Sequence, residues 1–247
     1  MPAGRLFVGT SGFAYPAWTP RFYPAGLAAR DLLSYYGGRF PAVELNNTFY
    51  ARPNAAKVAA WLAATPPDFR FAVKAQRGAS MRALLTDPVG SVPWLTEPLA
   101  AFGERLGAVL YRVPANVRRD DERLAALLAR WPRDLPLCLE FQDPSWLVDE
   151  TFAALAQAGA TLCATDLPDT DDEPTIRRTG AFLYLRLRRH AYPDAALASW
   201  AARIAPFLED GRDAYVFFRH DDDGRATEFA DRLRTAVEAG ARSMPGR

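Results

Sequence analysis

The sequence has few histidines, almost no net charge and no long hydrophobic segment, and each of these absences excludes a class of protein. Its two histidines are His190 and His220, so a zinc site built from several histidines is nearly excluded. The formal net charge of +1 does not indicate nucleic acid or an anionic membrane as a partner bound through bulk charge. No segment approaches the roughly 18 apolar residues of a transmembrane helix, so we expect no membrane partner.

Cysteine is also scarce, and its placement bears on the cellular compartment. Cys138 and Cys163 fall in two separate apolar segments, and strand alternation directs their side chains to opposite faces of a sheet. We therefore expect no disulfide between them. The N-terminus lacks a charged segment followed by a long apolar run, which is the pattern of a secretory signal. Together these features predict a reduced, cytoplasmic protein.

The length and composition are those of an ordinary globular protein. The 247 residues are enough for one large domain or two small ones, and no shift of composition marks a domain boundary. Apolar residues make up 49% of the chain and charged residues 24%, so a packed core can form. We expect a single domain over residues 1–247, with a disordered tail at residues 241–247.

Short apolar segments alternate with longer amphipathic ones along the whole chain. Helical patterns lie between most of the apolar segments, and the loop PDTDDEP after the sixth leaves room for a minimal helix at most. Eight segments are predicted as strands, namely residues 5–10, 41–46, 69–75, 108–113, 136–141, 160–166, 181–187 and 214–219.

Eight strands alternating with helices over about 250 residues are the length and rhythm of a (β/α)8 TIM barrel. A doubly wound open sheet is the competing architecture, but it has fewer strands in this length and often carries a glycine-rich nucleotide loop. Neither GxGxxG nor GxxxxGK[ST] occurs in the chain. The sequence therefore predicts an α/β protein with a single TIM barrel.

Alternation along each strand separates side chains that face the helices from those that face the barrel interior. In residues 41–46, Val43 and Leu45 form the apolar pair that faces the helices, which leaves Glu44 and Asn46 facing inward. Catalytic groups of barrel enzymes gather at the carboxyl ends of the strands. The other strands contribute polar residues near that end, namely Lys74, Arg112, Glu140, Asp166, Arg186, Arg188 and His220.

These charged groups predict a site for a small, anionic ligand. Basic side chains match or outnumber the carboxylates, and arginine anchors phosphate or carboxylate groups well. The candidate catalytic residues are Glu44, Glu140 and Lys74, since carboxylates transfer protons and a barrel lysine acts as a charge partner or, less commonly, as a Schiff-base amine. The candidate substrate-binding residues are Asn46, Tyr50, Asp166, Arg186, Arg188, Trp18 and Arg112.

Other interpretations of the same residues stay open. Inward Glu–Arg and Asp–Lys pairs can form a purely structural ion network, and loop aromatics such as Trp18 can simply close the barrel loops instead of stacking on a sugar ring. No motif indicates a cofactor, although carboxylates of this set could hold Mg²⁺ or Mn²⁺. GTSGF at residues 9–13 fails the GxSxG pattern of a nucleophile elbow, and DDDGRATEF at residues 221–229 fails the spacing of a calcium loop.

Several long motifs follow one another along the chain: GTSGFAYPAWTPRFYP, VELNNTFYARP, FRFAVKA, LEFQDPSW and the strand YLRL. In this order they resemble the YecE-like family, also called domain of unknown function 72. The resemblance covers about residues 5–237 and implies a TIM barrel without an established activity. The positions shared with the family pattern are Thr10, Gly12, Trp18, Tyr23, Glu44, Asn46, Phe49, Tyr50, Lys74, Glu140, Trp146 and Arg186.

The chain also departs from the family pattern. It has AQRGAS where a Thr-His pair usually follows the lysine of the third strand, and Gln142 where an arginine usually follows Glu-Phe. A changed substrate and a lost activity both agree with these departures.

Two functions from different classes remain. The leading hypothesis is an enzyme that hydrolyses or isomerises a small anionic or sugar-like molecule, with Glu140 or Glu44 as general acid or base. The alternative is a non-catalytic protein of the same fold that binds a metabolite or a nucleic acid. The sequence does not decide whether the protein is an enzyme.

Overall fold

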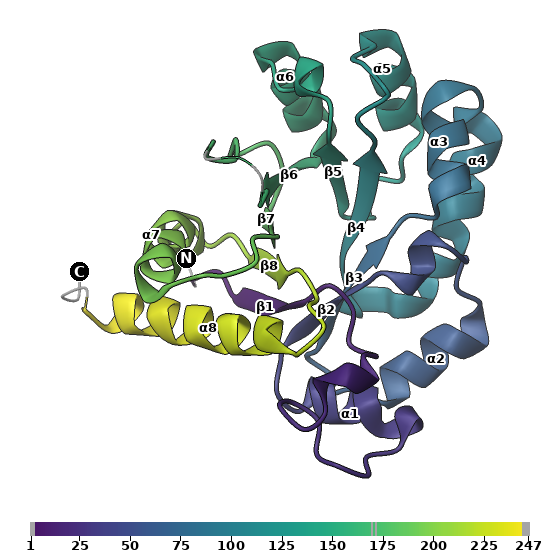
Figure 1. Cartoon of the computed structure of the whole chain (residues 1–247). Coiled ribbons are helices and arrows are strands. Elements are labelled where there is room, and N and C mark those ends of the chain that lie inside the picture. Colours follow the sequence, from purple (N-terminus) through teal and green to yellow (C-terminus); the bar gives the residue numbers. More distant parts are fainter. Residues whose placement is uncertain (1–2, 169, 171, 244–247) are drawn as a thin grey trace.

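The computed structural model describes residues 3–168, 170 and 172–243, and its centre is a ring of eight strands (Figure 1). Each strand overlaps one of the predicted segments. The strands are β1 (Leu6–Thr10), β2 (Ala42–Leu45), β3 (Arg70–Lys74), β4 (Leu106–Val113), β5 (Leu137–Phe141), β6 (Thr161–Asp166), β7 (Leu183–Leu187) and β8 (Ala214–Phe218).

The strands pair in the order β1-β8-β7-β6-β5-β4-β3-β2, and these pairings are parallel. A bridge between Ser11 and Glu44 brings the two ends of the sheet together, and the Gly12 amide donates a 2.8 Å hydrogen bond to the Glu44 carbonyl oxygen. The sheet is therefore a nearly closed barrel, which confirms the predicted TIM-barrel fold.

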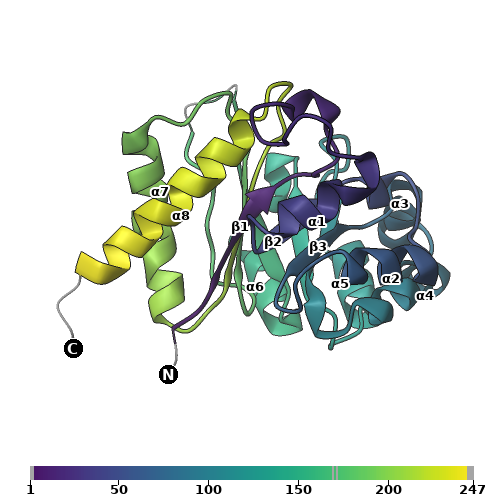
Figure 2. The same ribbon diagram turned by 90° about the horizontal axis from the view of Figure 1, so that it is seen from below.

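Helices cover the outside of the barrel, as Figures 1 and 2 show from two directions. They are α1 (Leu32–Gly37), α2 (Ala55–Ala63), α3 (Arg77–Leu85), α4 (Pro88–Thr96), α5 (Asp121–Arg130), α6 (Asp149–Ala158), α7 (Asp194–Glu209) and α8 (Arg225–Ser243). Both α3 and α4 follow β3, whereas the described part of the β6–β7 connection contains no helix. None of the described helices is long and apolar enough to cross a membrane. Of the tail expected to be disordered, residues 244–247 lie outside the described residues.

Two apolar layers stabilise the barrel. The larger layer lies between the strands and the helices, and it contains Val43 and Leu45 of β2 as predicted. The smaller layer fills the barrel interior, where the rings of Phe7 and Tyr215 stack with their centroids 4.9 Å apart. Because these side chains fill the interior, the inward-facing polar groups lie at the carboxyl ends of the strands. The interior layer consists of Phe7, Ala42, Ala72, Ala108, Leu110, Cys138, Cys163, Tyr184, Tyr215 and Phe217.

The prediction that Cys138 and Cys163 face opposite sides of the sheet is wrong. Both are free thiols, and both belong to the interior layer. The reason is that β6 is apolar on both faces: Leu162 and Ala164 pack against the helices while Cys163 points inward. Hydrophobicity alone therefore gives no indication of which way the alternation runs in this strand.

Candidate functional site

Three buried charged side chains meet at the carboxyl ends of β2, β5 and β7. Arg186 lies between Glu44 and Glu140, and the three side chains are 2%, 0% and 3% exposed, respectively. The Arg186 atoms Nε and Nη2 donate to Glu44 at 3.0 and 2.7 Å, while Nη1 donates to the two Glu140 oxygens at 2.8 and 3.0 Å. This Glu44–Arg186–Glu140 group is hereafter called the buried triad.

Neutral side chains complete the hydrogen bonding of the triad. Ser11 Oγ and Tyr184 OH donate to the two Glu44 oxygens at 2.7 and 2.9 Å, and Thr165 Oγ1 donates to Glu140 at 2.9 Å. Buried charges are tolerated when they are paired and fully hydrogen-bonded. The sequence does not identify Ser11 and Thr165 as partners, because a single serine or threonine carries no pattern that distinguishes it from others.

The triad holds both carboxylates in the ionised form. Burial by itself would raise the pKa of Glu44, but the positive charge and hydrogen bonds of Arg186 outweigh burial and lower the pKa to about 2. For Glu140, burial is again opposed by Arg186 and then Arg112, and the pKa is lowered. A general acid must carry a proton at the working pH, so neither glutamate is poised to donate one near neutrality.

The lowered pKa values predict a specific loss of stability in acid. A carboxyl group with a lowered folded-state pKa stabilises the fold above its unfolded-state pKa, and this contribution is lost as the pH falls toward the folded-state value. For Glu44 the window extends from 4.5 down to about 2. Urea unfolding is measured between pH 7 and pH 2 for the wild type and for the apolar variant Glu44→Leu/Glu140→Leu/Arg186→Met. The free energy of unfolding should fall more steeply with decreasing pH in the wild type than in the variant. Equal pH profiles for the two proteins would contradict the triad's ionisation.

Lys74 is a charged group of the site that lacks a carboxylate partner among the described residues. It ends β3, is 8% exposed, and its Nζ lies 4.4 Å from the centroid of the Phe49 ring. Among the described residues it forms no ion pair. Burial, followed by the positive charge of Arg186, lowers the pKa of Lys74 to about 8, although Glu44 and Glu140 oppose the shift. With this pKa, about one-tenth of the amine is unprotonated at pH 7 and about half at pH 8.

Two further arginines make the mouth of the barrel positive. Arg112, on β4, places Nε 3.2 Å from a Glu140 oxygen, and its side chain is one-third exposed. Arg188 follows β7 and is half-buried beside Arg186 and His220. Burial, and then Arg186, lowers the pKa of Arg188. The triad carries one net negative charge, so together with Lys74 and these arginines the mouth has an excess of positive charge that favours an anion.

The structure also places the remaining sequence-predicted residues. Tyr50 is 77% exposed at the rim, and Asn46 lies beside Tyr15, whose ring stacks on His220 at 4.7 Å. Trp18 is fully buried, and its Nε1 donates a 2.9 Å hydrogen bond to the Asp221 carbonyl oxygen. Trp18 thus joins the loops after β1 and β8, which meet at the top of Figure 2, in agreement with the loop-closing interpretation.

Asp166 lies outside this cluster. Since Cys163 points inward, alternation along β6 directs Asp166 outward, where Arg189 Nε and Tyr192 OH donate to it at 2.7 and 2.9 Å. Because both faces of β6 are apolar, hydrophobicity does not predict the orientation of Asp166, just as it does not predict that of Cys163. Within the described part of the chain, no group of three or more His, Cys, Asp or Glu side chains is arranged to hold a metal ion.

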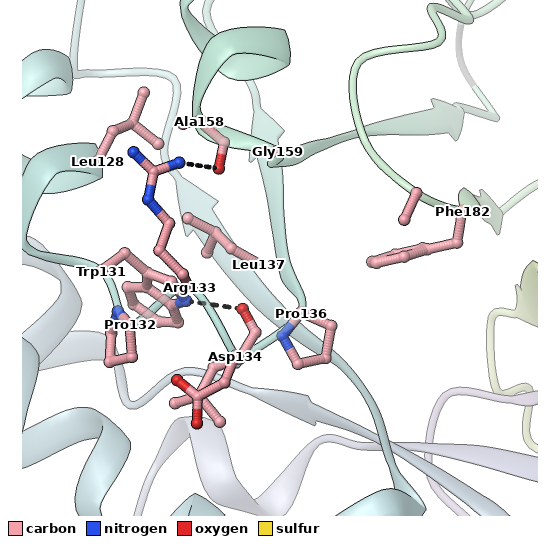
Figure 3. A pocket seen from close by; sticks show the side chains of 12 residues that line it. Leu128, Trp131, Pro132, Arg133, Asp134, Pro136, Leu137, Ala158, Gly159 and Phe182 are labelled. Carbon is pink, nitrogen blue, oxygen red and sulfur yellow. Dashed lines mark hydrogen bonds between the residues drawn. The ribbon is translucent and has the colours of Figure 1, made fainter.

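A separate hollow lies at the other end of the barrel, beside the amino end of β5 (Figure 3). Its volume is about 230 Å³. Arg133 donates to the Ala158 carbonyl oxygen at 2.9 Å and Trp131 Nε1 to the Leu135 carbonyl oxygen at 3.2 Å. These polar groups hold the connection between α5 and β5, and features at this end of a barrel relate to stability.

Comparisons with known proteins agree with the fold and with the motifs. Residues 7–246 match the family described as "Protein of unknown function DUF72". The UPF0759 protein YunF of Bacillus subtilis is 25% identical, with 83% of this chain and 86% of that protein covered. A DUF72 family protein of Thermotoga maritima has a TM-score of 0.78 at 26% identity, covering 95% of this chain and 99% of that one. A DUF72 family protein of Enterococcus faecalis has a TM-score of 0.78 at 19% identity, covering 94% and 95% of the two chains.

Proposed function

This chain belongs to the DUF72 family of proteins of unknown function, and from its own site we propose an enzyme that isomerises a small anionic, sugar-like carbonyl compound. Lys74 is the group that moves the proton. The observation that carries the proposal is the state of Lys74: a buried amine at a barrel strand end, with its pKa lowered to about 8 and with no ion-pair partner among the residues that the structure describes. A base with a pKa near the working pH is the most effective in proton transfer.

The chemistry follows from what each side chain can do. The neutral Lys74 amine removes a proton from the carbon next to the substrate carbonyl, and the electron pair moves to the carbonyl oxygen to form an enediolate. Nearby positive groups such as Arg112 stabilise that developing negative charge. The hydroxyl proton of the enediolate then passes to the former carbonyl oxygen on the adjacent carbon. The ammonium group returns its proton to the former carbonyl carbon, so that the carbonyl and hydroxyl positions are exchanged.

Hydrolysis receives less support from the same site. Cleavage of a glycosidic bond uses one carboxylic acid as proton donor and a second carboxylate as base or nucleophile. Here the pKa values of Glu44 and Glu140 are both lowered, and Arg186 hydrogen-bonds to both carboxylates. We therefore assign the two glutamates to positioning Arg186 and setting the charge around Lys74, and proton transfer to Lys74.

Exchange of carbon-bound hydrogen in D₂O tests the proposal, and it detects proton removal whatever the product is. The protein is incubated with sugar phosphates, sugar acids and hydroxyketones, and ¹H NMR follows loss of the signal next to the carbonyl. We expect exchange with at least one anionic compound, and its loss in the Lys74→Met variant. If compounds of this class bind and raise the melting temperature without any exchange, the protein is a metabolite-binding protein and the proposed activity is wrong.

A further inference from the structure

The geometry points to a second part of this site: a pocket between Arg77 and Arg112 that binds the phosphate or carboxylate group of the ligand. The pocket has a volume of about 330 Å³ and lies beyond the carboxyl ends of β2, β3 and β4. This size is at the lower end of the range for small-molecule sites. The inference rests on the proposed function where it calls that ligand a substrate.

The charged side chains that line the pocket are both positive. Arg77 and Arg112 line it, and its other lining residues are Phe49, Tyr50, Ser80, Met81 and Pro114, so no carboxylate is among them. Arg77 is exposed at the start of α3, and its side chain forms no ion pair within the described part of the chain. Arg112 pairs with Glu140 through Nε, and together with Arg77 it forms a favourable environment for an anion.

Arg112 is held in place on one side and open on the other. Its Nε lies 3.2 Å from Glu140, yet this buried nitrogen has no hydrogen bond of acceptable geometry. No described residue accepts a hydrogen bond from its terminal amino groups. The planar end of Arg112 is therefore available for a bidentate contact with a phosphate or a carboxylate, the arrangement that arginine favours.

The aromatic wall connects this pocket to Lys74. Phe49 lines the pocket, and Lys74 Nζ lies 4.4 Å from the centroid of its ring. Tyr50 meets Phe49 edge to face at 5.4 Å and is 77% exposed at the rim. An anion bound between Arg77 and Arg112 thus leaves the rest of a small ligand against Phe49, the same ring that the Lys74 amine contacts. Aromatic faces of this kind pack against the C–H bonds of a sugar.

Calorimetric titration with two simple anions tests the pocket. Inorganic phosphate and malonate are titrated separately into the wild-type protein and into Arg112→Met, Arg77→Met and the control Arg123→Met, which removes an exposed arginine of α5 that pairs with Asp120. We expect saturable binding of at least one anion, weakened about tenfold or more in Arg112→Met and several-fold in Arg77→Met, because hydrogen bonds to charged groups are strong. The Arg123→Met protein should bind as the wild type does.

The location is verified in protein labelled with ¹⁵N-lysine, which contains Lys57 and Lys74 as its lysines. Phosphate or malonate should shift the Lys74 signal and leave the exposed Lys57 signal unchanged. A response to phosphate alone indicates that the pocket binds the phosphate group of a ligand. A response to malonate alone indicates that it binds a carboxylate group. No saturable binding of either anion, or unchanged affinity in both pocket variants, would overturn the inference. Loss of binding in these variants without any D₂O exchange in the wild type would refute the isomerase and leave the pocket standing.

Discussion

The Arg186→Met variant is expected to lose about 3–5 kcal/mol of unfolding free energy, the range seen when one partner of a buried ion pair is removed. Arg186 is 2% exposed and makes four hydrogen bonds to Glu44 and Glu140. Without it, two carboxylates stay buried beside each other without a compensating charge, and ionisation of both becomes very unfavourable. Urea denaturation at pH 7 measures the loss directly.

A matched variant separates the removal of one charge from the removal of all three. Glu44→Leu/Glu140→Leu/Arg186→Met removes the three charges of the triad together, and replacement of an ion triad by apolar side chains is often neutral or stabilising. We expect this protein to recover most of the stability that Arg186→Met loses. If Arg186→Met were as stable as the wild type, the triad would not be the paired, buried network that the distances indicate.

The Lys74→Met variant is expected to lose the proposed exchange activity by a factor of about 10²–10⁴, which is the typical contribution of general acid–base catalysis. Lys74→Arg should be equally inactive, because a guanidinium group does not give up its proton in this pH range. In the wild type the exchange rate should rise with pH and level off above about 8, since the amine acts only when it is unprotonated. D₂O exchange rates between pH 6 and pH 9.5 measure this profile.

Two controls belong to that experiment. Lys57→Met removes an exposed lysine of α2 and should leave the exchange rate unchanged. Lys74→Met should be at least as stable as the wild type near neutral pH. Below its pKa the wild-type amine is protonated, and burial of this positive charge destabilises the fold. An inactive Lys74→Met protein that had also lost stability would indicate a structural role for this lysine.

The sequence allowed much of the fold to be predicted, because the strands are short and apolar and most of them are separated by a strong helical pattern. In β2 the alternation is clear, and Glu44 faces the interior as expected while Val43 and Leu45 face the helices. In β6 both faces are apolar, so the orientations of Cys163 and Asp166 were not accessible from hydrophobicity. Alternation is informative only where one face is polar.

The partners within the site were harder to predict than its members. Glu44 and Arg186 are 142 positions apart, and no local pattern shows that one guanidinium group bonds to both glutamates. The expected proton-transfer role of the glutamates depended on their environment, which the pairing determines. Lys74 was identified from its position on β3, but only the folded arrangement shows that it has no ion-pair partner within the described part of the chain.

The titration of Lys74 tests the proposed role of this lysine most directly. In protein labelled with ¹³C- and ¹⁵N-lysine, the Cε and Nζ shifts of Lys57 and Lys74 can be followed from pH 6 to pH 12, with Lys57→Arg providing the assignment. We predict a midpoint of about 8 for Lys74. A midpoint at or above 10.5, the ordinary value for a lysine, would mean that the amine is protonated near neutral pH and would contradict its role as the base.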